Sequence, residues 1–280
     1  EALVIGYAYV NYFPAPTTGI RLNPHILIGF CPWPGFWYPR SEAEQEFIKE
    51  QWLGWVQTGA RLFLRPNYFL DGYAMPHLFL HQFADEFQFM ARHGMVGTDF
   101  DSLTAQWATQ GPTLYLLARL HTRPEKPVEE LLEEYYSAFG PAARWVRAYF
   151  DYWEDYTARQ RERINALVQQ RGVSRYRQYA RIAHEIFPPE AFAPAEALLE
   201  KAAQAAAKEP EFAARVEFLR KGLRHAQLCV RAAALTPMGR LRLGPCAGPG
   251  RNSSPSAGPR RGRASPTSIG QPKWRLAVGM

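Results

Sequence analysis

The chain has 280 residues, of which 47% are hydrophobic and 21% are charged. This composition is typical of a globular protein with a sizeable buried core. No apolar run approaches the roughly 18 residues of a membrane-spanning helix, so we expect no membrane partner. Three cysteines, Cys31, Cys229 and Cys246, are too few for a disulfide framework or a four-thiolate zinc site.

The net charge of +7 comes from the C-terminal segment. Residues 237–280 carry seven arginines, one lysine and no acid, whereas the rest of the chain carries 25 basic and 26 acidic side chains. The segment is also rich in Pro, Gly and Ser, which predicts a disordered basic tail. It could act as an arm on nucleic acid, serve no specific purpose, or be translated out of frame. We do not expect nucleic acid to be the partner.

The chain opens directly on an apolar run, residues 2–10, with neither an initiator methionine nor a signal peptide. We therefore expect a piece of a longer protein. The compartment stays open, because a targeting segment would precede the first residue.

Four short apolar runs in the first hundred residues predict strands, at 3–10, 25–31, 61–65 and 95–99. They are continuously apolar, as in a parallel sheet covered on both faces. Helices are predicted at 41–56, 76–93 and 103–121, the first with Ser41 as its cap. Strand and helix alternate about every 35 residues, which is close to the unit of a (β/α)8 barrel. Residues 11–23 are too short for a full crossover helix. Residues 1–122 are therefore predicted to form the last four strand units of such a barrel.

From residue 123 to 236 the pattern predicts an all-helical region. The expected helices span 128–139, 141–170, 173–186, 190–207 and 210–235. Within the long second helix, aromatic residues recur at helical spacing. We expect this stripe to pack in the core rather than to bind a ligand; it consists of Trp145, Tyr149, Tyr152, Trp153 and Tyr156.

In a barrel of this class, the active site lies on the loops after the strands. Most acids of the first hundred residues fall on the predicted outer helices, where we expect solvated positions; Glu86 is one of them. Asp99 and Asp101 follow the fourth strand and are the predicted catalytic residues. Asp101 has an alternative role as the cap of the helix near residue 103.

The loops after the other strands are rich in groups that suit carbohydrates. Aromatic faces stack on the C–H face of a sugar, while amide, guanidinium and phenol groups hydrogen-bond to its hydroxyls or to a carboxylate. The aromatic loop 31–38 has an alternative role as a lid over the barrel end. The predicted substrate-binding residues are Tyr9, Asn11, Trp33, Trp37, Tyr38, Arg65, Asn67, Tyr68, Asp71 and Trp107.

Other motifs are weaker. His77, His81 and Asp85 have metal-like spacing along one helix, but they lack the glutamate of HExxH, and we expect no metal there. The sequence contains no phosphate-binding glycine loop and no G-x-S-x-G, so no cofactor is expected. Cys31 is expected to be a packing residue.

Two motifs carry a family resemblance. One is W-x-x-Q-G-x-x-x-Y-x-x-A-R-L, from Trp107 to Leu120, and the other runs from Tyr135 to Ala142. With shorter upstream motifs, they make residues 1–190 resemble bacterial glycosidase-like proteins that carry domain of unknown function 4838. That family is grouped with the TIM-barrel glycoside hydrolases. The resemblance implies a retaining or inverting glycosidase allied to α-glucuronidases or hexosaminidases.

The resemblance also implies a carboxylate, often Glu, near Gly97–Asp101, a place that Asp99 or Asp101 would fill here. In many TIM-barrel members the proton donor follows strand four, which would precede residue 1. The leading expectation is thus a glycoside hydrolase acting on a carbohydrate substrate. A non-catalytic carbohydrate-binding relative is the main alternative. A helical interaction protein with a nucleic-acid-binding tail is another.

Overall fold

The computed structural model of the chain describes residues 2–32, 38–67, 74–101, 103, 106–173 and 179–236. These residues belong to one compact unit. The basic tail at 237–280 lies outside them. Within the described part of the chain, no helix combines the length and the apolar character needed to cross a bilayer.

The first hundred residues contain a four-stranded parallel sheet. Its strands are β1 (Val4–Ala8), β2 (Ile26–Phe30), β3 (Arg61–Leu64) and β4 (Met95–Thr98), and they neighbour one another in chain order. All three pairings are parallel, with one irregularity between Leu62 and Phe63. The predicted α/β class and the four strands are confirmed. The short first connection contains a 3-10 turn (Val10–Tyr12) and still joins parallel strands.

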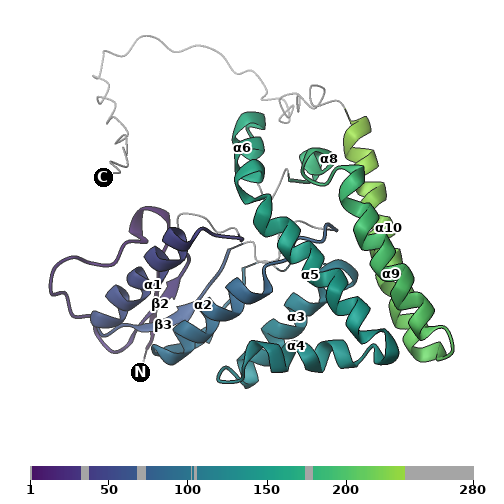
Figure 1. The fold of residues 1–280 in the computed structure, drawn as a ribbon. Helices are drawn as coiled ribbons and strands as arrows, with labels where there is room; N and C mark the ends of the chain where they lie inside the picture. Colours follow the sequence, from purple (N-terminus) through teal and green to yellow (C-terminus); the bar gives the residue numbers. More distant parts are fainter. Residues whose placement is uncertain are drawn as a thin grey trace, which may run out of the picture. The chain divides into compact units, whose positions relative to one another are not determined.

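Helices α1 (Glu42–Gln57) and α2 (Leu80–Arg92) pack beside this sheet (Figure 1). Helix α1 starts as predicted: Ser41 and Glu44 form a reciprocal capping box that satisfies backbone N–H groups of the first turn. Trp52 of α1 is fully buried and meets the ring of Phe30 edge-on at 5.2 Å. Helices α1 and α2 therefore cover part of the sheet.

The outer strands of the sheet, β1 and β4, carry apolar side chains that are exposed to solvent. Leu3, Val4, Ile5 and Tyr7 on and beside the edge strand β1 are exposed, and Val96 of β4 is half exposed. The expectation of a sheet covered on both faces is therefore wrong for these edge strands. Buried side chains dominate the two central strands, β2 and β3.

The remainder of the described chain is helical. Its helices are α3 (Trp107–Thr122), α4 (Val128–Ser137), α5 (Ala143–Arg159), α6 (Arg161–Arg171), α8 (Ala183–Ile186), α9 (Phe192–Ala206) and α10 (Pro210–Leu235). Helices α9 and α10 lie side by side (Figure 1). The prediction of a single helix at 141–170 is wrong, because the helical backbone is interrupted at Gln160, between α5 and α6.

The aromatic stripe of α5 forms the centre of this region, as predicted. Tyr149 and Trp153 are fully buried, and Tyr156 donates a hydrogen bond of 2.6 Å to the carbonyl of Ile186. Trp153 meets the rings of Phe187 and Phe192 edge-on. These contacts identify the stripe as core packing.

Candidate functional site

The ends of β3 and β4 bring polar side chains together at the carboxyl edge of the sheet. The backbone pairing continues one residue beyond the strands: Arg65 N–H donates to Phe30 O at 2.8 Å, and Asp99 N–H donates to Leu64 O at 2.9 Å. These hydrogen bonds fix the backbone positions of Arg65 and Asp99. Active sites of parallel α/β proteins lie at this edge.

Arg65 gathers three other side chains into what we name the rim cluster: Arg65, Asn67, Asp99 and Asp101. Its Nε donates to Asp99 Oδ2 at 3.0 Å, and its Nη2 donates to Asp101 Oδ1 at 2.8 Å. Its Nη1 donates to Asn67 Oδ1 at 2.6 Å. The structure thus assembles four of the residues that the sequence predicted. Asp101 does not cap a helix, because α3 begins later, after Gln106.

The acids of the rim cluster are more open to solvent than its arginine. The Asp99 side chain is 53% exposed and that of Asp101 is 32% exposed, against 21% for Arg65. Burial lowers the pKa of Arg65, but the charge of Asp101 and the hydrogen bond to Asp99 outweigh it and raise that pKa above its ordinary value. Arg65 therefore stays charged, and carboxylate oxygens face the solvent.

Tyr7 is a residue of this edge that the sequence reasoning missed. Its ring lies 5.1 Å from the Arg65 guanidinium and meets Phe63 edge-on at 6.2 Å. Gly29 lies between them, and a Cβ there would come within 2.5 Å of Tyr7. The signal was available: Tyr7 is two residues before Tyr9 in the apolar run predicted as a strand at 3–10, and alternate residues of a strand point to the same side.

Cys31 lies next to Arg65 and is buried. Burial raises the pKa of its thiol to about 11, against the opposing effect of Arg65. The thiol is therefore protonated near neutral pH and is a poor nucleophile. The expected packing role agrees with this position.

Tyr9 and Asn11 follow β1 and are exposed. Between them, Val10 has a φ of 48°. A β-branched residue in this left-handed region is strained, at a cost of about 1–3 kcal/mol. The turn holds two predicted site residues at the carboxyl edge of β1.

Tyr38 lies in the core instead of facing a ligand. Its ring stacks on Phe79 at 4.5 Å, and its hydroxyl donates to Glu86 Oε2 at 2.6 Å. Arg40 forms an ion pair with the same Glu86 oxygen, and both side chains are shut off from water. The expectation of a solvated Glu86 is therefore wrong. We name Tyr38, Arg40 and Glu86 the core cluster.

Trp107 lies at the start of α3 and is half exposed. It lines a cavity of about 490 Å³ with aromatic residues from α4 and α10, among them Tyr135 and Phe218. The rim cluster contributes nothing to this lining. The structure therefore places Trp107 apart from the residues around Arg65. Trp33, Trp37, Tyr68 and Asp71 lie outside the described residues.

The histidines with metal-like spacing have other partners. His77 contacts the carbonyl of Tyr38 at 2.8 Å. His81 lies between Glu154 and Glu129, with its ring nitrogens 2.8 and 2.9 Å from their carboxylate oxygens. Among the described residues, no group of His, Cys, Asp and Glu side chains is arranged to hold a metal ion.

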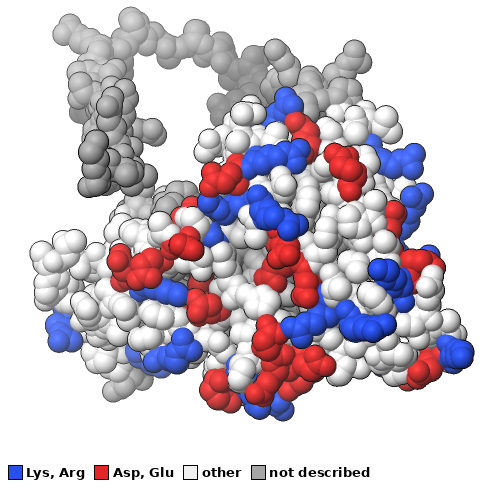
Figure 2. Space-filling model, viewed as in Figure 1, with Lys and Arg blue, Asp and Glu red and all other residues white. Residues whose placement is uncertain are grey.

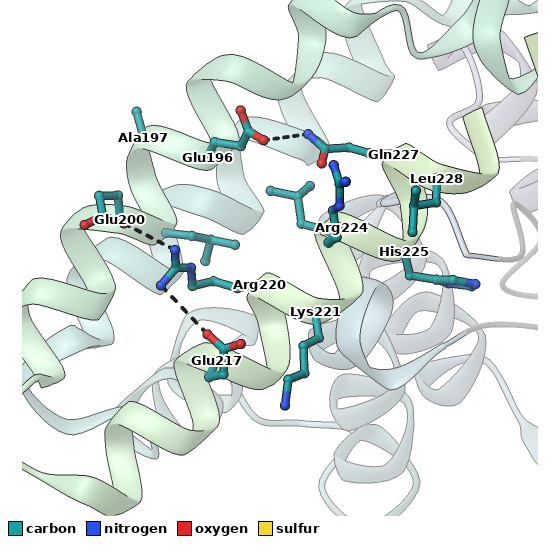
Figure 3. Close-up of a pocket in the computed structure, with 12 residues that line it drawn as sticks. Glu196, Ala197, Glu200, Glu217, Arg220, Lys221, Arg224, His225, Gln227 and Leu228 are labelled. Atoms are coloured by element: carbon teal, nitrogen blue, oxygen red, sulfur yellow. Dashed lines mark hydrogen bonds and ion pairs between the residues drawn. The ribbon is translucent and has the colours of Figure 1, made fainter. Parts of the chain in front are cut away.

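A further groove of about 720 Å³ runs between α9 and α10 (Figure 3). Arg220 pairs with Glu200 and Glu217, and Gln227 donates to Glu196 (Figure 3). Figure 2 likewise shows acidic and basic side chains mixed over the face that it presents.

Comparison with known protein families gives a match. The family model of a domain of unknown function (DUF4838) covers residues 1–151, which include the sheet and the rim cluster. No curated protein and no solved structure matches the chain. Because the match spans more than half of the sequence, the chain belongs to the DUF4838 family.

Proposed function

We propose that the rim cluster is the carbohydrate site of a glycoside hydrolase. The observation that carries the proposal is the convergence on Arg65 of two carboxylates and an amide from neighbouring strand ends, beside the ring of Tyr7. Carboxylates and amides hydrogen-bond to sugar hydroxyls, and glycosidases act with carboxyl groups. The aromatic ring adds a surface of the kind that packs on a sugar.

The fold supports the same proposal. Parallel strands that neighbour one another in chain order, with helices between them, are the arrangement found within a (β/α)8 barrel. In the proposed enzyme these four strands are the last four of such a barrel. The rim cluster would then lie at the mouth, where barrel enzymes hold their active sites.

In this proposal, Asp99 acts as an ionised carboxylate, either as nucleophile or as the base that activates water. It is the more exposed of the two acids, and Arg65 donates a hydrogen bond to its Oδ2. Asp101 and Asn67 hold the guanidinium in place. The proton donor would be a carboxyl group outside the rim cluster, because both of its acids are bound to Arg65.

Replacing Asp99 with Asn tests the assignment. Hydrolysis of aryl glycosides should fall by at least a hundredfold, while sugar affinity measured by calorimetry should change little. The matched control is Asp85→Asn, since Asp85 pairs with Lys49 on the outer side of α2. Unchanged hydrolysis in the Asp99 variant would overturn the catalytic role.

A carbohydrate-binding protein without hydrolysis is the second candidate. It is favoured by the ion pairs that hold both acids of the rim cluster on one arginine. Sugar binding without turnover of any aryl glycoside by the unmodified chain would select this candidate.

A further inference from the structure

The charge at the carboxyl edge of the sheet restricts which sugar can bind there. Four loops follow the strands, at residues 9–24, 31–41, 65–79 and 99–106. By sequence they contain three arginines, Arg21, Arg40 and Arg65, and no lysine. The position of each arginine decides whether an anionic ligand finds a cation.

Arg40 and Arg65 are both committed to the protein's own acids. Arg40 is buried in the core cluster against Glu86. Arg65 donates from its Nε, Nη1 and Nη2 atoms to the other members of the rim cluster. Neither guanidinium is therefore available for a carboxylate from solvent.

Arg21 belongs to the other end of the sheet. Its guanidinium approaches Gly59, which lies between the end of α1 and the start of β3. The next residue, Leu22, donates its N–H to Thr58 O at 2.9 Å. These contacts place Arg21 at the amino edge.

Histidines supply no replacement. His77 is buried and contacts the carbonyl of Tyr38. His121, which reaches Thr98 of β4, has Nε2 2.6 Å from the Thr98 hydroxyl and Nδ1 2.7 Å from Leu117 O. The positions of these loops outside the described residues, 33–37, 68–73, 102, 104 and 105, add no basic residue to the sequence and one acid, Asp71.

The rim cluster therefore has one positive and two negative charges, and the negative ones are the more exposed. A ligand that approaches it meets carboxylate oxygens, which accept hydrogen bonds from hydroxyls and repel another carboxylate. We infer that the site takes a sugar whose ring bears hydroxyl groups and no carboxylate, and that it discriminates against uronic acids. This inference rests on the proposed function, and it selects against the α-glucuronidase side of the family resemblance.

Matched ligand pairs test the inference on the full chain. Methyl glycosides of glucose, galactose and mannose, in both anomers, are compared by calorimetry with the corresponding glycosides of glucuronic, galacturonic and mannuronic acid. Each pair differs in a hydroxymethyl group against a carboxylate. At low salt the neutral member of each bound pair should bind at least about fivefold more tightly than the uronic acid. This ratio of affinities should shrink as salt screens the charges.

Two variants locate the source of the preference. Asp99→Asn removes the more exposed charge and should reduce the ratio about threefold. Asp85→Asn removes a carboxylate from α2 and should leave the ratio unchanged, which controls for net charge. An equal response of both variants would contradict a role for the rim cluster.

The outcomes separate the inference from the proposed function. A uronic acid that binds as tightly as its neutral partner, or more tightly, overturns the inference and leaves a carbohydrate site in place. No binding by any of the pairs overturns both. A neutral preference that falls about threefold in Asp99→Asn supports the inference and the carbohydrate site on which it rests.

Discussion

The sheet region holds two arginine–carboxylate clusters in opposite surroundings. In the core cluster, Arg40 and Glu86 are almost completely shut off from water, and Tyr38 completes the contact. In the rim cluster, Arg65 holds two acids that remain open to solvent. Breaking a buried pair leaves an unpaired charge in the interior, whereas breaking an exposed pair lets water replace the lost partner. The first cluster should therefore govern folding and the second ligand binding.

The largest expected effect on stability comes from Glu86→Ala in the core cluster. The change removes the buried carboxylate that pairs with the Arg40 guanidinium, so we expect a loss of about 3–5 kcal/mol in the free energy of unfolding, measured with urea. The neighbouring residue gives a control, because Asp85 pairs with Lys49 in solvent and Asp85→Ala should cost less than about 1 kcal/mol. Equal losses in the two variants would mean that the burial of the core cluster does not stabilise the protein.

A smaller effect is expected from Gly29→Ala in the sheet beneath the rim cluster. The added methyl group would press on the rings of Tyr7 and Phe63 at 2.5 and 2.7 Å. We expect a destabilisation of about 1–3 kcal/mol by urea unfolding. A Cβ added to Gly97 of β4 would have no neighbour within 4 Å, so Gly97→Ala should leave the stability unchanged. A neutral Gly29→Ala would show that this face of the sheet packs loosely.

Arg65→Lys sharpens the comparison at the rim. Lysine keeps the positive charge but cannot donate from three nitrogen atoms in one plane, so Asp99, Asp101 and Asn67 lose their common partner. Stability should fall by less than about 1 kcal/mol. The affinity for the sugar that the unmodified chain binds should fall about tenfold by calorimetry. A loss of stability as large as that of Glu86→Ala would remove the distinction between the clusters.

The smallest effect concerns pH at an ion pair outside both clusters. Hydrogen bonding to Glu154 raises the pKa of His81 to about 9, with Glu129 adding to the rise. Because the folded-state pKa lies above the ordinary value of about 6.5, this contribution is complete below pH 6.5 and disappears as the pH rises through 9. Urea unfolding should show a decline of up to about 1 kcal/mol over that interval. In His81→Gln the decline should be smaller, and an identical decline would assign it to other groups.

The sequence predicted the strands because continuous apolar runs and regular spacing are local signals. Asp99, Asp101, Arg65 and Asn67 were found by position, since each follows a strand and parallel strands end at the same edge. Glu86 was missed because an acid on a helix was expected to be solvated, although it lies on the same buried face of α2 as Phe83 and Met90. The acid is buried because Arg40 and Tyr38, more than 40 residues away in sequence, reach it.

Other errors have the same origin in tertiary contacts. Trp107 and Tyr38 carry the residue type expected of sugar-binding positions, but their neighbours come from distant helices. The break between α5 and α6 falls at Gln160, where neither proline nor glycine signals it. Composition identifies a residue's chemistry, whereas its surroundings depend on contacts that a single sequence does not specify.

The open edge of β1 has a consequence for how the chain behaves in concentrated solution. Among the residues that the structure describes, no strand pairs with its outer backbone N–H and C=O groups, and the strand Val4–Ala8 contains no charged residue. Proteins commonly protect such an edge with lysine, proline or a bulge. Without that protection, β1 is a template on which a strand from another molecule can add, so colloidal stability should depend on whatever covers this one strand.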